Sequence, residues 1–163
     1  MTRFDPTPPD VRAGERIAGG SGDTGGPGSG GHAGRDAWET LGFRRTHEEP
    51  GRVTLEWEAG PEWTSRTSAG TAVQGGLVTA LLDAAMGSAC STVLDADQGL
   101  LTADLRAEFL RPTPPGHLHC TGQVVRRTSS VVFCSADLYD AAGTHLAAAR
   151  CTQVVVAAGP AAS

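Results

Sequence analysis

The sequence predicts an α+β fold in which one antiparallel sheet packs against one long central helix. Three observations indicate this class. Residues 75–93 form an apolar segment of helical length, two strand-like segments precede it, and three or four more follow it in succession. At 163 residues, the chain is long enough for one domain with a substantial hydrophobic core.

We expect the domain to span residues 36–156, between two tails. Residues 1–35 are rich in Gly and Pro and show almost no apolar periodicity, so they cannot bury enough surface to offset the entropy lost on ordering. The Gly-rich run at 19–34 follows no strand and precedes no GK[ST], which separates it from a phosphate-binding loop. The sequence therefore predicts a disordered N-terminal tail and a short flexible C-terminal tail at 157–163.

The segments ahead of the long helix predict a short helix, a hairpin and a loop. DAWETLGF has an Asp N-cap and a Gly stop, as short helices do. RRTHEE and RVTLEWEA flank Pro50-Gly51, and in the second arm Val53, Leu55 and Trp57 alternate with polar residues, which indicates a half-buried strand. The polar segment PEWTSRTSAGT is expected to be a loop that leads to the long helix.

The segments after the long helix predict a meander of strands separated by turn residues. They are LLTADLRAEFL, HLHCTGQVVRR, SSVVFCSADLYD and THLAAARCTQVVV.

Composition restricts the classes of partner. A net charge of −5 argues against non-specific nucleic-acid binding. All 13 basic residues are Arg, so guanidinium groups or backbone amides must meet any anionic ligand. No apolar run of about 18 residues and no secretory signal pattern occurs, so we expect a cytoplasmic protein without a membrane partner. Its four cysteines are then reduced, buried thiols, namely Cys90, Cys120, Cys134 and Cys151.

Asp83 is the single charged residue between Thr67 and Leu94. The surrounding helix is apolar or small on every face and is therefore expected to be buried. An unpaired buried carboxylate costs several kcal/mol. One interpretation is a tolerated group that faces water or a subunit interface; the other is a general base or nucleophile.

Gly75 and Gly76 open the same helix. Their backbone N–H groups, together with the helix dipole, make a donor site for a developing oxyanion. Eight residues separate Gly75 from Asp83, which is about 12 Å of helical rise and too far for both to act on one carbon. A second copy of the chain could supply the missing group, so the spacing predicts a dimer with composite sites.

Two segments resemble a known family. QGGLVTALLDAAMG is similar to the His-Gly-Gly-x6-Leu-[Asp/Glu] signature of hotdog-fold acyl-CoA thioesterases of the PaaI type, and TADLRAEFLRPTPPG is similar to that group's Thr-x-Asp-Leu-x3-Phe-Leu-Arg-Pro run. The final strand pair, with its Arg-Arg turn and Asp-x-x-Gly hairpin, fits as well. The resemblance covers about residues 36–156.

The resemblance implies a hotdog fold, an antiparallel sheet wrapped around one long helix, that assembles as a homodimer and often as a homotetramer, a dimer of dimers. The expected reaction is hydrolysis of an acyl-CoA thioester, for which an aromatic acyl group is one candidate, or of an acyl-carrier-protein thioester, with no cofactor and no metal. Asp83 would be base or nucleophile, and Gly75 N–H with Gln74 would polarise the carbonyl. The expected substrate-binding residues are Ser68, Gly76, Gly87, Ser88, Arg111, Arg126, Arg127, Ser129 and Ser130.

Two positions depart from the family pattern. The motif His is Gln74 here, and an Asn common six residues earlier is Ser68. A Gln amide can still donate to a carbonyl oxygen, but it cannot carry a positive charge. Two other functions therefore stay open. One is a dehydratase or tailoring enzyme acting on a CoA- or carrier-bound intermediate, and the other is an acyl-CoA-binding module without catalysis.

The histidines and serines outside these motifs suggest no further chemistry. His117 and His119 share a strand face but have no evident third ligand, so we expect them on the surface, as we do His47 and His145. No GxSxG nucleophile elbow occurs.

Overall fold

The structure is a computed structural model, and it describes residues 37–68 and 70–158. The predicted N-terminal tail and all but the first two residues of the predicted C-terminal tail lie outside these ranges. The elements, in chain order, are α1 (Ala37–Leu41), β1 (Arg44–Glu49), β2 (Arg52–Ala59), the 3-10 helix η1 (Pro61–Trp63), β3 (Thr64–Thr67), β4 (Gly70–Val73), α2 (Gly75–Ser91), β5 (Gln98–Phe109), β6 (Gly116–Arg127), β7 (Val131–Asp140) and β8 (His145–Ala157).

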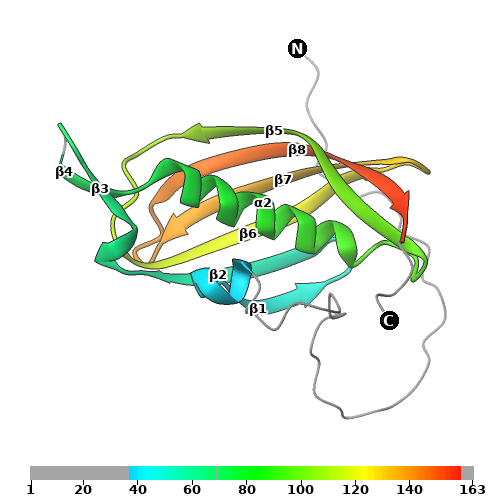
Figure 1. Ribbon diagram of the computed structural model, residues 1–163, viewed down its shortest axis with the longest axis horizontal. Coiled ribbons are helices and arrows are strands. Elements are labelled where there is room, and N and C mark those ends of the chain that lie inside the picture. The colour runs from blue at the N-terminus through cyan, green and yellow to red at the C-terminus, as the bar shows by residue number, and fades with distance from the viewer. Residues whose placement is uncertain (1–36, 69, 159–163) are drawn as a thin grey trace, which may run out of the picture. The chain divides into compact units, whose positions relative to one another are not determined.

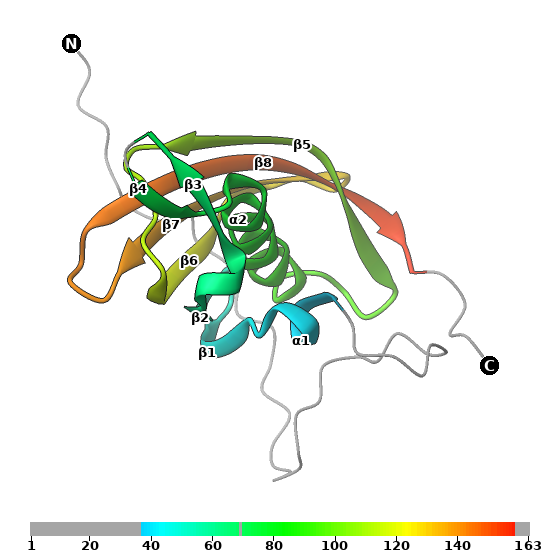
Figure 2. The same cartoon turned by 60° about the vertical axis from the view of Figure 1, so that its left-hand side comes forward.

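One curved sheet of six antiparallel strands holds the long helix α2 against one of its faces (Figure 1). The strand order is β1-β2-β6-β7-β8-β5, so β1 and β5 are the edge strands. In Figure 2 the sheet arches over α2, with β5 on one side and β1 and β2 on the other. This confirms the predicted α+β class and the hotdog arrangement.

The predicted meander and hairpin are confirmed, and the predicted loop at 61–71 is wrong. That segment contains η1 and a two-stranded ribbon in which β3 pairs with β4. Most of the ribbon's residues are exposed, so it shows no apolar alternation from which a strand could be recognised. At the other end of the domain Ala157 pairs with Gln98, so the sheet continues one residue into the predicted tail.

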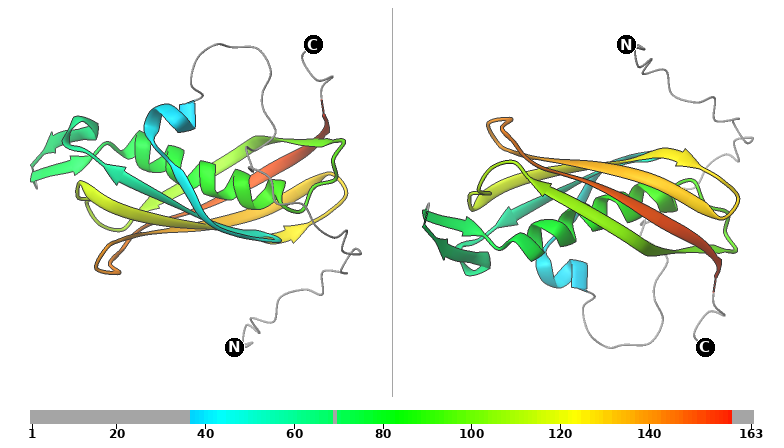
Figure 3. Two further views of the ribbon diagram at one scale, coloured as in Figure 1. Left: turned by 90° about the horizontal axis from the view of Figure 1, so that it is seen from below. Right: turned by 90° about the horizontal axis from the view of Figure 1, so that it is seen from above.

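A hydrophobic core, mostly aliphatic, fills the space between α2 and the sheet. Its largest fully buried side chains include Trp57, Leu81, Leu82, Met86 and Leu138. The two views of Figure 3 show α2 lying along the sheet and crossing its strands at a shallow angle. The long helix is thereby fixed in place by contacts along its whole length.

Strand β5 contains a bulge that changes which side chains face the helix. Thr102 lies opposite Gln153 of β8, but Asp104 lies opposite Thr152, because Ala103 is the extra residue. Thr102 consequently faces α2, whereas Asp104, only two residues later, faces away. Without the bulge, strict alternation would put both on one face.

All four cysteines are free and buried. Burial, followed by the charge of Asp137, raises the pKa of the Cys120 thiol. Hydrogen bonds with Cys151 and Cys90 raise the pKa of Cys134. Both thiols are therefore protonated at neutral pH, which argues against a role as nucleophile. Among the described residues, no helix combines the length and the apolar character needed to cross a bilayer.

Candidate active site

Gln74 forms the N-terminal cap of α2. Its backbone is extended, and its side-chain Oε1 accepts a hydrogen bond of 3.2 Å from the N–H of Leu77. Gln is uncommon as a cap, but its amide oxygen performs the same function as that of the usual Asn. With Oε1 occupied by the helix, the Nε2 amide group is left as a donor on an exposed side chain.

Gly75 and Gly76 are the first two residues of α2. No hydrogen bond from either backbone N–H occurs within the described residues. These are two of the four donors that every helix leaves unpaired at its start. The positive end of the helix dipole acts at the same place. Two backbone donors are therefore unpaired at the start of α2, and their role in binding an anion remains a prediction.

Asp83 lies near the middle of α2, within the same uninterrupted helix as Gly75. The prediction that this helix is buried on all sides is wrong for one stripe. Gly76 is exposed and Ala80, Asp83 and Gly87 are half-buried, and these positions follow one another at helical spacing. The stripe lies beside the edge strand β5, where the sheet ends. Its openness explains how the chain tolerates a carboxylate there without an ion pair.

Thr102 of β5 is the hydrogen-bond partner of Asp83. Its Oγ1 lies 3.0 Å from Asp83 Oδ1 and donates to it. A carboxylate with one oxygen held in this way keeps its other oxygen, Oδ2, available for a proton from water or substrate. Thr102 is not among the residues predicted from the sequence. It opens the quoted TADLRAEFL run, and it is the one hydroxyl in that run.

Two more predicted residues line a hollow of about 370 Å³ beside the start of α2. These are Ser68 and Arg111. Val73, Val78 and Phe109 supply much of its apolar wall. The ring of Phe109 also lies close to Gly75, since a Cβ added to Gly75 would be 3.4 Å from its Cζ. An acyl chain or a pantetheine arm could be accommodated next to the free N–H groups.

Arg111 is anchored to the protein. Its Nη1 donates a 2.7 Å hydrogen bond to the backbone carbonyl of His145. This contact ties the end of β5 to the start of β8. The guanidinium nevertheless has further N–H donors, so a bound anion would not have to displace that bond.

The guanidinium group of Arg127 also makes hydrogen bonds within the protein, whereas that of Arg126 makes none to a described residue. The Arg127 guanidinium donates to the Val93 carbonyl, to Gln98 Oε1 at 2.9 Å and to Asp95 Oδ2 at 3.2 Å. It thus clamps the connection between α2 and β5. Arg126 is exposed, and its side chain makes no hydrogen bond or ion pair to another described residue. Ser129 and Ser130 are exposed in the adjoining turn between β6 and β7.

Gly87 and Ser88 lie on different sides of α2. Gly87 shares the open stripe with Asp83, and a Cβ there would be 3.9 Å from Leu100 Cδ1. Ser88 is 4% exposed, and its Oγ lies 3.5 Å from Arg45 Nη2. Substrate could therefore approach Gly87 from the Asp83 side, whereas Ser88 faces β1.

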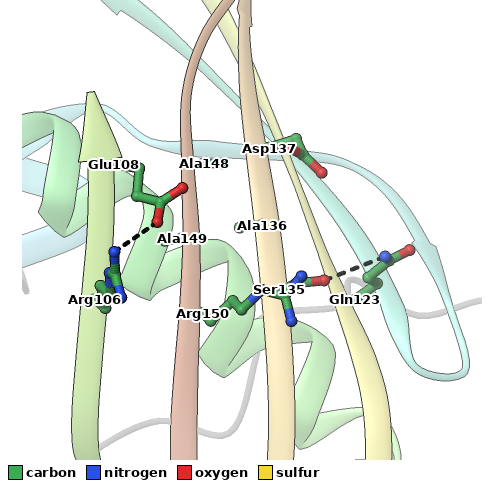
Figure 4. Close-up of a pocket in the computed structure, with 9 residues that line it drawn as sticks. All are labelled: Arg106, Glu108, Gln123, Ser135, Ala136, Asp137, Ala148, Ala149 and Arg150. Carbon is green, nitrogen blue, oxygen red and sulfur yellow. Dashed lines mark hydrogen bonds and ion pairs between the residues drawn. The ribbon is translucent and has the colours of Figure 1, made fainter. Parts of the chain in front are cut away.

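A separate hollow of about 500 Å³ lies on the sheet face that is turned away from α2 (Figure 4). It is lined by Arg106, Glu108, Gln123, Ser135, Ala136, Asp137, Ala148, Ala149 and Arg150. None of the predicted site residues is among these. Arg106 is paired with Glu108 at 3.1 Å, and Gln123 donates to Ser135 at 3.2 Å. The sheet separates this hollow from Asp83.

The described histidines make local contacts. His117 Nδ1 lies 3.5 Å from Glu58 Oε2, and His119 stacks on Tyr139 with ring centroids 5.4 Å apart. His145 stacks on the same tyrosine, and its Nε2 lies 2.9 Å from Asp137 Oδ1. In the ranges 37–68 and 70–158, no three His, Cys, Asp or Glu side chains are grouped as metal ligands would be.

One known protein family matches the part of the chain that contains α2 and β5. The family model of the thioesterase superfamily matches residues 70–147, a segment that includes α2, β5, Gly75, Asp83 and Thr102. Over residues 70–147 the chain is similar to the thioesterase superfamily. The matched segment begins at β4 and ends within β8, so it contains Gln74, Gly75, Asp83 and Thr102 but not Ser68.

Individual similar proteins include a curated protein and solved structures. A Saccharolobus solfataricus protein named provisionally as an esterase is 34% identical over 96 residues, which are 58% of this chain and 65% of the relative. The chain thus matches just under two thirds of that relative's length.

Two solved structures illustrate the fold. A thioesterase family protein from Silicibacter pomeroyi is 23% identical with a TM-score of 0.69, and the match covers 76% of this chain and 91% of that one. A Ralstonia eutropha JMP134 protein, described provisionally as a thioesterase related to phenylacetic acid degradation, is 26% identical with a TM-score of 0.66. That match covers 75% of this chain and 92% of the other.

Proposed function

We propose that the protein hydrolyses an acyl-CoA thioester to a free acid and CoA. The observation that carries the proposal is the pair of features on α2, a hydroxyl-bound carboxylate on an open stripe and unpaired N–H groups at the helix start. The similarity of residues 70–147 to the thioesterase superfamily supports the reaction class. Aromatic acyl groups are the first to test, because the Ralstonia relative is described as related to phenylacetic acid degradation.

In the proposed mechanism, Asp83 takes a proton from a water molecule as the water oxygen attacks the thioester carbonyl carbon. The resulting oxyanion accepts hydrogen bonds from Gly75 N–H and from Gln74 Nε2. When the intermediate collapses, the C–S bond breaks and Asp83 returns the proton to the leaving thiolate. Direct attack by Asp83 Oδ2, which would form an anhydride that water then hydrolyses, is the alternative route.

The two halves of the site are proposed to come from two protomers. Within one helix, Gly75 and Asp83 are separated by about 12 Å of rise, more than one reacting carbon can bridge. Strand β5 is a 12-residue edge whose side chains include Leu101, 62% exposed, and Phe109, 54% exposed. Long apolar edges of this kind are usually paired with another strand. Pairing of β5 with β5 of a second copy would bring the partner's α2 stripe alongside.

The remaining substrate contacts are proposed for the CoA portion. Arg126, Ser129 and Ser130 are exposed donors that could bind its phosphates. Ser68 and Arg111 would border the narrower channel beside Gly75. Arg127 could take part only with donors that its loop contacts do not use, and Ser88 only after a change in its packing.

A thiol-release assay tests the proposal. Purified protein is incubated with phenylacetyl-, benzoyl-, acetyl- and palmitoyl-CoA, and CoA release is followed for the wild type and for Asp83→Asn. We expect release with at least one substrate and a loss of about 10²-fold or more in Asp83→Asn, as for other general bases. Asp97→Asn, an exposed carboxylate in the loop after α2, is the control.

Two other results would point to the rival functions. Tight acyl-CoA binding without thiol release would identify a binding module. Conversion of the acyl group with the thioester left intact would identify a dehydratase or tailoring enzyme.

A further inference from the structure

Gln153 is a fully buried polar residue next to the candidate site. It lies on β8, directly opposite Thr102 of β5, and its side chain is 0% exposed. The neighbouring inward residues of β8 are Ala149, Cys151 and Val155, so Gln153 interrupts an otherwise apolar strand face. A buried amide is costly unless its polar atoms are paired, and such groups are usually retained for a specific contact.

Both ends of the Gln153 amide have partners. In the structure the amide oxygen Oε1 lies 3.1 Å from Thr102 Oγ1, and the amide nitrogen Nε2 lies 3.3 Å from Cys151 Sγ. The amide can also be turned over, which exchanges its oxygen and its nitrogen. Thr102 Oγ1 is in turn 3.0 Å from Asp83 Oδ1. A continuous series of hydrogen-bonding groups therefore runs from a core thiol to the carboxylate on α2.

The Thr102 hydroxyl has one proton and can therefore donate only one hydrogen bond. An ionised Asp83 can only accept, so the hydroxyl must give its proton either to Asp83 or to Gln153. If the amide oxygen faces Thr102, two acceptors compete for one proton. If the amide nitrogen faces Thr102, the nitrogen donates to Oγ1, Thr102 donates to Asp83, and the Cys151 thiol donates to the amide oxygen. The two orientations place heavy atoms at the same points, and the second leaves no two acceptors competing for the Thr102 proton.

We propose that Gln153 is a positioning residue, whose amide nitrogen donates to Thr102 and thereby commits the Thr102 proton to Asp83. This inference rests on the proposed thioester hydrolysis. Gln153 touches neither substrate nor water. Its effect is to hold Oδ1 of Asp83 and so to aim Oδ2 at the reacting water, which is a requirement of the chemical step and not of substrate binding.

Steady-state kinetics of Gln153→Met test the proposal, because Met has a similar size and no donor. We expect kcat to fall about tenfold or more, as for other outer partners of catalytic groups, with KM changed less than about twofold. Thr102→Val should also lower kcat. The double variant should be no slower than Thr102→Val alone, because Gln153 acts through Thr102.

Leu146→Val is the matched control, since it trims a buried side chain at the start of the same strand without touching the polar series. It should lose stability with kcat unchanged. If Gln153→Met does not fold, Cys151→Ala is the second variant. It frees the far end of the amide, so it should lower kcat in the wild-type background and have no effect in Thr102→Val.

The opposite results are equally clear. A wild-type kcat in Gln153→Met, or a full additional loss when it is combined with Thr102→Val, would overturn the inference. So would an unchanged kcat in Cys151→Ala, if that variant has to be used. If these results occur while Asp83→Asn is inactive, the proposed function stands without the inference. A wild-type protein with no thiol release would instead remove the proposed function, and the inference with it.

Discussion

Gly122 of β6 lies directly against the backbone of Ala85 in α2. A Cβ added to Gly122 would collide with the carbonyl group of Ala85 and would lie 2.7 Å from the nitrogen of Met86. At this point helix and sheet approach closely enough that no side chain fits between them. The contact lies about half a turn of helix beyond Asp83, so it sets the height of the carboxylate above the sheet.

Gly122→Ala should therefore be strongly destabilising. Because the obstacle is helix backbone, α2 would have to move, and we expect a loss of about 3 kcal/mol or more in the free energy of unfolding. Urea denaturation measures this loss. Gly99→Ala on β5 is the control, because its added Cβ would lie at an ordinary 3.5 Å from Val156. Equal stability of the two variants would contradict the prediction.

Gly75→Pro removes one candidate oxyanion donor while preserving the helix. Gly75 is the first helical residue, a position that accepts Pro well, and the extended backbone of Gln74 suits a residue before Pro. We expect kcat/KM about 10²–10³ below that of Gly75→Ala, which adds a Cβ but keeps the N–H. Circular dichroism and thermal unfolding should show that both variants are folded. Equal activity of the two would exclude the Gly75 N–H from the site.

Mixing two inactive variants tests whether the site is shared. Asp83→Asn retains Gly75, and Gly75→Pro retains Asp83, so a heterodimer of the two has one intact composite site. After denaturation and joint refolding, random pairing should restore about a quarter of wild-type activity. The separately refolded variants are the control. No recovery, in a mixture shown by mass spectrometry to contain heterodimers, would mean that each site lies within one protomer.

Gln74→Glu separates capping from catalysis. A carboxylate at this position can still accept from the Leu77 N–H, and its negative charge suits the helix start. It offers no donor to the substrate carbonyl and repels an oxyanion. We expect a melting temperature equal to or above that of the wild type and kcat lowered about tenfold or more. A fully active Gln74→Glu would show that the amide is needed only as a cap.

Asp140 predicts a pH dependence of stability. Its carboxylate accepts backbone N–H groups of Thr144 and Ala142 in the β7–β8 turn, and the Thr144 contact is the main reason that the Asp140 pKa is lowered. Because the folded-state pKa lies below 3.8, the stabilisation is present above that value and is lost as the pH falls through the folded pKa. Thermal unfolding of wild type and Asp140→Asn should differ at pH 7 and converge as the pH falls through the folded-state pKa of Asp140.

The parts of the fold that were predictable are those with a strong local pattern. Alternation in β2 and the apolar length of α2 predicted their positions, and the Gly75–Asp83 spacing predicted that one helix could not complete the site. The β3–β4 ribbon had no such pattern, because its side chains are mostly solvated. Among the ribbon's described side chains, only Ala72 and Val73, at the end of β4 next to α2, are buried, and two adjacent residues make no alternating pattern.

Thr102 and Gln153 illustrate what sequence patterns do not contain. Alternation alone would place Thr102 on the same face as Asp104, and the bulge at Ala103 reverses this relationship. Gln153 is 51 residues beyond Thr102 in the sequence, and only the pairing of β5 with β8 brings them together. Arg127 is a third residue whose contacts are not visible in the sequence. It lies at the end of β6, and only the folding of the sheet brings it to the α2–β5 connection.

The burial of every thiol has a practical consequence for enzymology. Released CoA is commonly measured with reagents that react with any accessible thiolate, and all four cysteines of the folded chain are enclosed. The folded enzyme should add no background colour, even at high protein concentration. When the chain unfolds, four thiols per molecule become reactive at once. One reagent can thus report turnover under native conditions and the opening of the core under denaturing ones.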